Sequence, residues 1–389
     1  MLKNCNKIWT KKYSTCTINQ ENSIQNIIKK HNHHNNKPFI IFHPNNVINK
    51  INQWNLLLPN VKPYYAIKSN HEHHILNIMK QFNINYDCAS KNEIKTILDN
   101  NCHGDKIIFA NPSKIPEHIL YAKNNNIKLL TFDSFDEMNK IKLLYPKAQL
   151  IIRIKVDDSQ SDLKFNTKYG VDINDVPMML RYASLLELNV VGVSFHVGSR
   201  CKNTDVYNSA LYLTRQVYDI ALKYDYRLSI VDIGGGFPGY DDYAFRKMSM
   251  SIHMGIHEYF NKIKINFIAE PGRYFASSAY TIVAKVINRK IYTDKTIYYI
   301  NEGVYGCFNN TLTDKEPIII NTLKSNDKLF NTTIFGPSCD SLDCIANNIK
   351  LPELEIGDYI YAENMGAYTV SCATNFNGLV PAKVKYILY

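Results

Sequence analysis

Residues that could carry out chemistry on a carbonyl compound stand at the ends of short apolar runs in this chain. Lys68, Asp87, Arg153 and His196 each lie at the end of such a run. A lysine amine adds to an aldehyde to form a Schiff base, and carboxylate and imidazole groups transfer protons around it. An amine among apolar side chains is costly to bury as a cation, so desolvation lowers its pKa toward the nucleophilic form. Lys68 is therefore a candidate nucleophile, and the alternative is a lysine paired with a carboxylate.

A glycine run supplies a second chemical feature. Gly234, Gly235 and Gly236 belong to the segment DIGGGFPG, and Arg273 follows a later apolar run in EPGR. Glycine-rich turns also serve loop geometry alone, and this spacing is not the dinucleotide-binding G-x-G-x-x-G. Backbone N–H groups of such a run can hold an anion, so together with the arginine it predicts a phosphate site. A phosphate site near a Schiff-base lysine indicates pyridoxal 5′-phosphate (PLP) as the cofactor.

The apolar runs themselves predict the fold. Eight runs of strand length recur in the first two thirds of the chain, and most are separated by segments with apolar residues three and four apart. The runs are 62–67, 84–88, 106–110, 127–131, 149–154, 190–196, 228–233 and 266–269. Strands that alternate with helices in this way predict an α/β fold of the TIM (β/α)8 barrel type. In that fold the active-site residues gather at the carboxyl ends of the strands.

The last third of the chain has a different pattern. Stretches rich in tyrosine and β-branched residues follow one another with few helical runs between them, which predicts a C-terminal all-β domain. Examples are 280–286, 296–300, 358–362 and 382–388. We therefore expect a flank over 1–37 that packs with the β domain, a PLP-binding barrel over 38–277, and a β-sandwich or β-barrel domain over 278–389.

Composition narrows the class of protein. The net charge is +10, but the lysines form no basic block, so no nucleic-acid partner is expected. No stretch approaches the roughly 20 apolar residues that cross a bilayer, and the opening residues lack the apolar core of a secretory signal. We expect no membrane association and a cytoplasmic location. Nine cysteines without a C-x-x-C pair predict reduced thiols. No metal site is expected, since Ile75 stands where a zincin helix needs its second histidine after HEHH.

Nine segments occur in the same order as in a known family. They are PYYAIKSN, DCAS, FANPSK, SFHVGS, DIGGGFPG, EPGRYF, GVYGCFNN, GPSCDSLD and ENMGAYT. In these segments the chain resembles the eukaryotic-type ornithine decarboxylases, and the resemblance runs from about Pro38 to the end. This family belongs to the alanine racemase-like class of PLP enzymes, which also contains arginine, lysine and diaminopimelate decarboxylases.

The resemblance implies roles for the barrel residues. Lys68 would hold PLP, Glu270 would face the pyridine nitrogen and keep it protonated, and His196 would stack on the ring. A hydrogen-bonded core histidine is the alternative for His196. The residues that would complete the cofactor site are Asp87, Arg153, Ser199, Gly234, Gly235, Gly236, Arg273 and Tyr368.

The resemblance also implies that the β domain supplies residues across a dimer interface. Cys339 would return a proton to the substrate carbon that loses carbon dioxide. Asp314 and Asp340, with Tyr305 nearby, would bind the distal ammonium group of the substrate. Each active site would then need both chains of a homodimer. The alternative for Cys339 is an ordinary small buried thiol.

Two departures from the family bear on the substrate. The turn Thr313, Asp314 and Lys315 stands where family members commonly have Tyr-Asp-His, and Arg200 replaces a glycine beside Ser199. The resemblance implies decarboxylation of L-ornithine to putrescine in polyamine biosynthesis. Because the altered turn changes the distal pocket, arginine and lysine are alternative substrates. A further alternative is an inactive regulatory paralogue of the antizyme-inhibitor kind, although such a protein does not need a complete set of cofactor residues.

Overall fold

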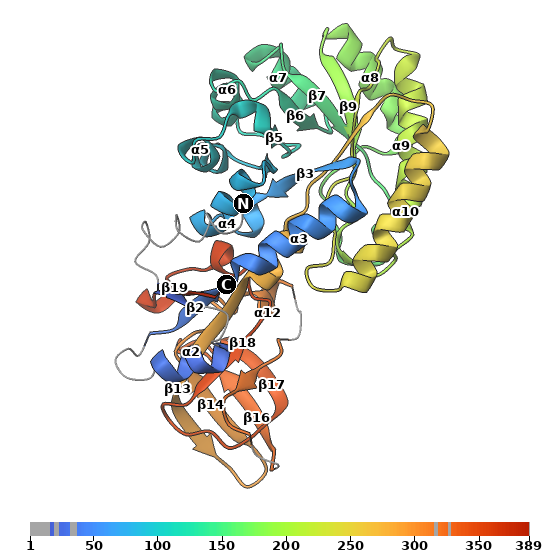
Figure 1. Cartoon of the computed structure of the whole chain (residues 1–389). Helices are drawn as coiled ribbons and strands as arrows, with labels where there is room; N and C mark the ends of the chain where they lie inside the picture. The colour runs from blue at the N-terminus through green and yellow to red at the C-terminus, as the bar shows by residue number, and fades with distance from the viewer. Residues whose placement is uncertain (1–15, 19–22, 32–36, 315–317, 326–327, 389) are drawn as a thin grey trace. The chain divides into compact units, whose positions relative to one another are not determined.

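The structure is a computed structural model that describes residues 16–18, 23–31, 37–314, 318–325 and 328–388. The chain divides into two compact units, one over Lys50–Phe275 and the other over Met1–Asn49 together with Ala276–Tyr389. The first unit contains the alternating strands and helices, and the second contains most of the remaining strands (Figure 1). Lys315 of the predicted substrate turn lies outside the described residues.

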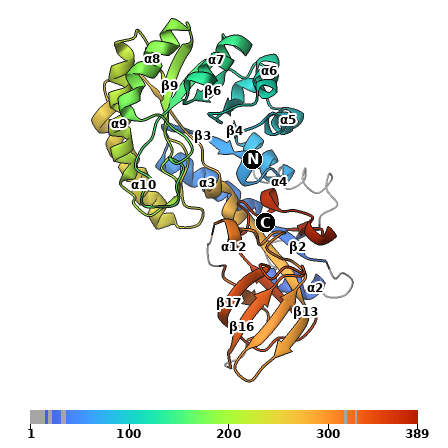
Figure 2. The same cartoon turned by 180° about the vertical axis from the view of Figure 1, so that it is seen from behind.

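Eight parallel strands of the first unit close into a barrel in the order β11-β12-β3-β4-β5-β6-β7-β9 (Figures 1 and 2). The strands are β3 (Val61–Ala66), β4 (Asn85–Cys88), β5 (Ile107–Phe109), β6 (Leu129–Phe132), β7 (Gln149–Arg153), β9 (Asn189–Ser194), β11 (Ile230–Asp232) and β12 (Asn266–Ala269). Each matches one of the eight predicted runs, so the predicted α/β barrel is confirmed. Tyr64, Ile108, Ile151 and Ile268 come from four different strands and form one buried cluster.

Helices follow most of the barrel strands, and three of them, α5, α7 and α10, begin where a short polar side chain caps the first turn. Ser90 accepts the N–H of Glu93 at the start of α5, and Ser134 accepts that of Glu137 at the start of α7. These are the S-x-x-E patterns that mark a helix start. The helices are α4 (His73–Gln81), α5 (Lys91–Asp99), α6 (Pro116–Asn124), α7 (Phe135–Leu144), α8 (Val176–Leu185), α9 (Val206–Leu222) and α10 (Asp242–Phe260). Loops follow the carboxyl ends of the strands, and the site residues are predicted to lie at these ends.

The second unit is built on the twelve-residue strand β13 (Tyr280–Ile291), which pairs with three other strands of a nine-stranded sheet. Its strands are β1 (Cys16–Ile18), β2 (Phe39–Phe42), β13, β14 (Thr296–Ile300), β15 (Asn321–Thr322), β16 (Phe330–Phe335), β17 (Cys344–Leu351), β18 (Tyr359–Ala362) and β19 (Lys383–Leu388). The predicted C-terminal all-β domain is confirmed. The nine-stranded sheet also includes β2, which was expected in the barrel segment over 38–277. Helix α2 (Ile24–His31) packs Ile27 and Ile28 into the same core.

Within the described residues, no helix has both the length and the apolar character to span a bilayer.

Candidate active site

Lys68 lies in the short helix η1 (Ile67–Ser69), directly after β3. Its Nζ is 2.8 Å from Oδ2 of Asp87, which is 1% exposed and belongs to the neighbouring strand β4. The side chain of Lys68 is 45% exposed in this chain. The expectation that burial activates Lys68 is therefore wrong. The structure pairs the amine with the carboxylate of Asp87, which holds it in place.

Two acids lie beside this ion pair, of which Asp232 is fully buried and Glu270 partly buried. Asp232 ends β11 and accepts the N–H of Gly234 at 2.9 Å through Oδ1, and Glu270 follows β12. The two carboxyl groups lie close enough that the charge of Asp232 disfavours ionisation of Glu270. Burial raises the pKa of Glu270 well above its usual value, and the negative charges of Asp232 and Asp87 raise it further. Burial likewise raises the pKa of Asp232, so the pair shares a proton rather than ionising twice. Sequence reasoning missed Asp232, although its place at a strand end was a usable signal.

His196 follows β9 and is buried as a neutral ring. The N–H of Gly198 donates to its Nδ1 at 3.0 Å, so the ring proton is on Nε2. Burial lowers the pKa of His196 well below 6.5, and the nearby charges of Arg153 and Lys68 lower it further. The edge of Phe165 contacts the ring at a centroid distance of 4.7 Å. A neutral, fixed imidazole suits packing against a flat ring.

The glycine run comes close to His196. Gly234 has φ +64, and a Cβ there would lie 2.2 Å from the carbonyl oxygen of Phe195. A Cβ on Gly235 would lie 2.8 Å from Nε2 of His196. Side chains are therefore excluded, and the backbone can approach whatever binds beside the histidine. Ser199 in β10 (Ser199–Cys201) and Arg273, three residues after Glu270, flank the same loops in sequence.

The structure thus brings one group of predicted residues together at the carboxyl ends of the barrel strands. Lys68, Asp87, Arg153, His196 and Glu270 lie close enough that their charges shift the pKa values of buried members of the group. The group contains both positively and negatively charged side chains. Perturbed pKa values of this kind cluster at functional sites.

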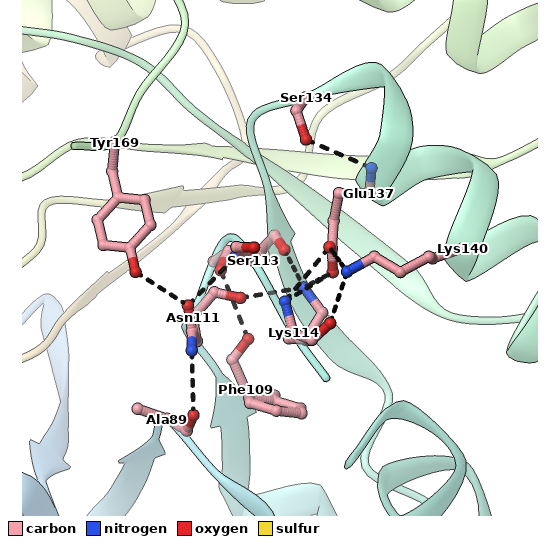
Figure 3. A network of polar contacts seen from close by, with 10 residues as sticks. Ala89, Phe109, Asn111, Ser113, Lys114, Ser134, Glu137, Lys140 and Tyr169 are labelled. Atoms are coloured by element: carbon pink, nitrogen blue, oxygen red, sulfur yellow. Dashed lines mark hydrogen bonds and ion pairs between the residues drawn. The ribbon is translucent and has the colours of Figure 1, made fainter. Parts of the chain in front are cut away.

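Arg153 lies over the ring of Tyr169, which belongs to a polar network of the barrel loops (Figure 3). Its guanidinium carbon lies 5.3 Å from the centroid of the Tyr169 ring. The Tyr169 hydroxyl donates to Oδ1 of Asn111 at 3.4 Å, and Nδ2 of Asn111 donates to the carbonyl oxygen of Ala89 at 3.3 Å. Asn111 therefore joins the loops after β4 and β5 to the segment that supports Arg153.

Lys114 anchors this network from inside the protein. Its Nζ donates to the carbonyl oxygen of Asn111 at 3.0 Å and lies 2.8 Å from Oε1 of Glu137 (Figure 3). Glu137 also pairs with Lys140 at 2.6 Å. Burial lowers the pKa of Lys114 to about 8, and Glu137 opposes that shift. Removing one member of such a buried pair costs about 3 to 5 kcal/mol, so the loop is held firmly. The segment FANPSK carried no predicted role, but the S-x-x-E pattern at Ser134 pointed to Glu137.

Arg200 adopts φ +54, the left-handed region where a glycine would be free of strain. Its Nη2 lies 3.2 Å from Oδ2 of Asp162, which also pairs with Lys202 at 3.0 Å. Asp162 belongs to β8 (Ser161–Leu163), the partner of β10. The ion pair holds the guanidinium beside the antiparallel strands β8 and β10.

The second unit gathers three of the remaining predicted residues. The Tyr305 hydroxyl donates to Oδ2 of Asp340, and Cys339 is exposed. An exposed Cys339 removes the alternative of a buried thiol. Asp343, 1% exposed, accepts the N–H groups of Val304 at 2.8 Å and Ser338 at 2.9 Å. It thereby fastens the loop of Cys339 to the loop of Tyr305.

Two other predicted residues of this unit lie elsewhere in it. Asp314 is 5% exposed and ends the short helix α12 (Asn310–Thr313). Tyr368 has φ +57, a strained conformation for a large side chain that occurs most often at functional sites.

Comparison with known proteins gives one consistent class. The family model described as "Pyridoxal-dependent decarboxylase, pyridoxal binding domain" matches residues 45–277, and "Pyridoxal-dependent decarboxylase, C-terminal sheet domain" matches 197–366. A probable ornithine decarboxylase of Dictyostelium discoideum is 40% identical over 87% of this chain and 77% of its own length. Antizyme inhibitor 2 of Xenopus laevis is 37% identical over 85% of this chain and 76% of its own length.

A solved structure is similar over nearly the whole chain. The arginine decarboxylase of Paramecium bursaria Chlorella virus, bound to agmatine, has a TM-score of 0.90 and 34% identity. The match covers 94% of this chain and 99% of that one. The barrel, the sheet unit and the lysine at the strand ends define a pyridoxal-binding protein of the barrel class. The chain belongs to the pyridoxal-dependent decarboxylase family of ornithine and arginine decarboxylases.

The shared proton of Asp232 and Glu270 predicts how stability depends on pH. Because burial raises both pKa values, the folded chain holds protons above pH 4 that the unfolded chain has released. Stability from this pair is therefore complete below pH 4 and declines as the pH rises. Asp232→Asn keeps an acceptor for Gly234 and removes one acid, so the PLP-free variant should be more stable than wild type at pH 8 by about 2 kcal/mol. The difference should close toward pH 4, as measured by urea unfolding.

Asp242 provides a control of opposite sign. The hydrogen bond from Lys50 lowers the pKa of Asp242, so Asp242→Asn should be no more stable than wild type at pH 8. An Asp232→Asn chain that is less stable than wild type at pH 8 would show that the two acids do not compete for a proton.

Proposed function

We propose that this protein is a PLP-dependent decarboxylase that converts L-ornithine to putrescine and carbon dioxide. The observation that carries the proposal is the pairing of Lys68 with buried Asp87, beside neutral His196 and the protonated acid pair at Glu270. Membership of the pyridoxal-dependent decarboxylases and the similarity to ornithine decarboxylase relatives support it.

The barrel residues fit PLP. Oδ1 of Asp87 is buried and, among the described residues, accepts no hydrogen bond, and the glycine run leaves the edge of His196 accessible to a ligand. Lys68 supplies the amine that attaches to the cofactor's aldehyde. The glycine N–H groups with Ser199 and Arg273 bind its phosphate, as does Tyr368. When bound, PLP withdraws the electron pair that remains when carbon dioxide leaves.

Glu270 determines which reaction the site favours. Its carboxyl group shares a proton with Asp232, and Asp87 keeps further negative charge nearby. If the pair gave up its proton to the ring nitrogen of bound PLP, the Glu270 carboxylate would stabilise the protonated ring, the strongest electron sink, which decarboxylation needs. A racemase of this fold would be expected to place a cation there and weaken the sink.

The second unit supplies the substrate residues. Asp340, held by Tyr305, and buried Asp314 are carboxylates suited to the distal ammonium group of a basic amino acid. Cys339 returns a proton to the substrate carbon. We propose that these residues act on the barrel of a partner chain, so that the working form is a cytoplasmic homodimer with two shared sites.

Arginine is the second candidate substrate. The similar viral structure is an arginine decarboxylase bound to agmatine, and Thr313 leaves more room beside Asp314 than a tyrosine would. The similarity to an antizyme inhibitor adds the alternative of a regulatory protein. Retention of the paired Lys68 and the protonated acid pair argues against it, because a protein without a cofactor gains nothing from these buried charges.

Borohydride reduction of the PLP-loaded protein should attach the cofactor irreversibly to Lys68. The amine lies against Asp87 at the carboxyl end of β3, where the phosphate-binding loops are expected. Peptide mass spectrometry locates the label. Lys68→Ala should abolish the label and the yellow absorbance, whereas Lys62→Ala, an exposed lysine of β3, should keep both. Label on another lysine would refute the assignment.

Mixing two inactive variants tests the shared sites. Lys68→Ala and Cys339→Ala chains each lose activity, but a hybrid dimer contains one site with both residues intact. Since half of randomly mixed dimers are hybrids, about a quarter of wild-type activity should return. Mass spectrometry of the intact dimers verifies exchange. Verified exchange with no recovered activity would exclude sites shared between chains.

Carbon dioxide release from ornithine, lysine and arginine measures the substrate preference. Ornithine should have the highest kcat/KM, and lysine, one methylene longer, should be poorer by about 1 to 3 kcal/mol. Asp314→Ala should raise KM for ornithine strongly, since loss of a charged partner costs about 2 to 5 kcal/mol, without changing the PLP absorbance. A higher kcat/KM for arginine would reassign the substrate and leave the decarboxylase chemistry in place.

A further inference from the structure

Asn377 contacts the proposed proton donor in two ways. Its Oδ1 lies 3.1 Å from the backbone nitrogen of Cys339 and 3.3 Å from the Cys339 sulfur. The backbone N–H can only donate, so the side-chain atom that faces it must be the amide oxygen. The same oxygen therefore also faces the sulfur and accepts its hydrogen. One amide thus holds both the main chain and the thiol of Cys339.

The turn that carries Asn377 is itself fastened in place. Thr374 donates its N–H to the carbonyl oxygen of Tyr305 at 2.8 Å and its hydroxyl to the same oxygen at 3.1 Å. The ring of Phe376 lies 4.3 Å from that of Tyr305, whose hydroxyl donates to Asp340. The turn therefore contacts the Cys339 loop through Asn377 directly and through Tyr305 indirectly.

The backbone at Asn377 explains why an asparagine can occupy this position. Its φ is +55 and its ψ is 17, the left-handed region that asparagine and glycine adopt more readily than other residues. Gly378 follows with φ +72 and closes the turn by donating to the carbonyl oxygen of Asn375 at 2.9 Å. Two successive left-handed residues aim the amide at Cys339.

We propose that Asn377 is a positioning residue that holds the Cys339 thiol in one orientation. The inference rests on the proposed decarboxylase function, in which the thiol hydrogen goes to the substrate. A rotation about the Cβ–Sγ bond turns the hydrogen from Asn377 toward a substrate carbon without moving the sulfur.

In the proposed step, Cys339 transfers its proton to the substrate. The S–H bond of Cys339 breaks, a C–H bond forms at the carbon that lost carbon dioxide, and the electron pair of the S–H bond stays on sulfur. Water then restores the thiol. With PLP bound, a proton delivered to the cofactor instead of the substrate carbon would, after hydrolysis, give an amino aldehyde in place of the diamine and the amine form of the cofactor. A wrongly oriented thiol therefore changes the product as well as the rate.

The test variant is Asn377→Gly, because glycine keeps the left-handed backbone and removes only the amide. Asn377→Asp retains an acceptor oxygen of the same size and serves as the rescue. The matched control is Asn348→Gly, at an exposed asparagine of β17 with φ +56. Cys372, also exposed, is an internal reference for thiol reactivity in every chain.

The first measurement is alkylation of the PLP-loaded protein by iodoacetamide, in which the sulfur displaces iodide. Relative to Cys372, Cys339 should react about three- to tenfold faster in Asn377→Gly than in wild type, since a hydrogen bond that holds the thiol is lost. Asn348→Gly should react as wild type does. Equal ratios in wild type and Asn377→Gly would overturn the proposal.

The second measurement is the product of turnover with ornithine. Asn377→Gly should lower kcat, leave KM unchanged, and raise the fraction of amino aldehyde, and Asn377→Asp should restore the wild-type fraction. An equal rise in Asn348→Gly, or none in Asn377→Gly, would overturn the proposal. If wild type releases no carbon dioxide while the alkylation difference remains, the proposed function fails and the hold of Asn377 on the thiol stands.

Discussion

The pairing of the first and last barrel strands is the interaction on which the site depends. β3 and β12 are about 200 residues apart in the chain, yet Phe267 pairs with Val61 and Ala269 with Pro63. Beyond the strand ends, the N–H of Ala66 donates to the carbonyl oxygen of Pro271 at 3.2 Å. This contact brings the loop of Glu270 beside the strand that leads to Lys68. Without closure the amine and the acid pair would lie at opposite edges of an open sheet.

Closure brings charges together at the carboxyl ends of the strands, and each has to be balanced. Lys68 and Asp87 form an ion pair, Asp232 and Glu270 share a proton, and Lys114 lies against Glu137. The two lysines differ in burial. Lys68 remains half exposed, whereas Lys114 is fully enclosed. A lysine that must react stays accessible, and a lysine that only supports a loop does not.

In the sheet unit, side-chain oxygens accept hydrogen bonds from backbone N–H groups of the loops. Asp343 uses its two oxygens for the amides of Val304 and Ser338, and Asn377 uses one oxygen for Cys339. Short polar side chains thus replace regular secondary structure in the loops that carry the proposed substrate residues.

Much of the molecule was determined by the sequence itself. Eight apolar runs separated by helical segments predict a parallel barrel. Because all its strands run in the same direction, Lys68, Asp87, Arg153 and His196 lie at the same end of the barrel. The ordered segments also identified the family. Residue type and strand order, which are properties of the sequence, sufficed for these results.

Only the tertiary structure decided how those residues are charged and held. Lys68 and its partner Asp87 are 19 residues apart in the chain. Asn377 and Cys339 are 38 residues apart, as are Asp232 and Glu270. The distances between these side chains depend on how the segments fold together. Strand β2 joined the sheet unit because its edge hydrogen bonds are satisfied by β13 and β19, which follow the barrel in sequence. A pKa or a loop anchor is set by burial and by neighbours in space, and spacing along the chain does not encode either one.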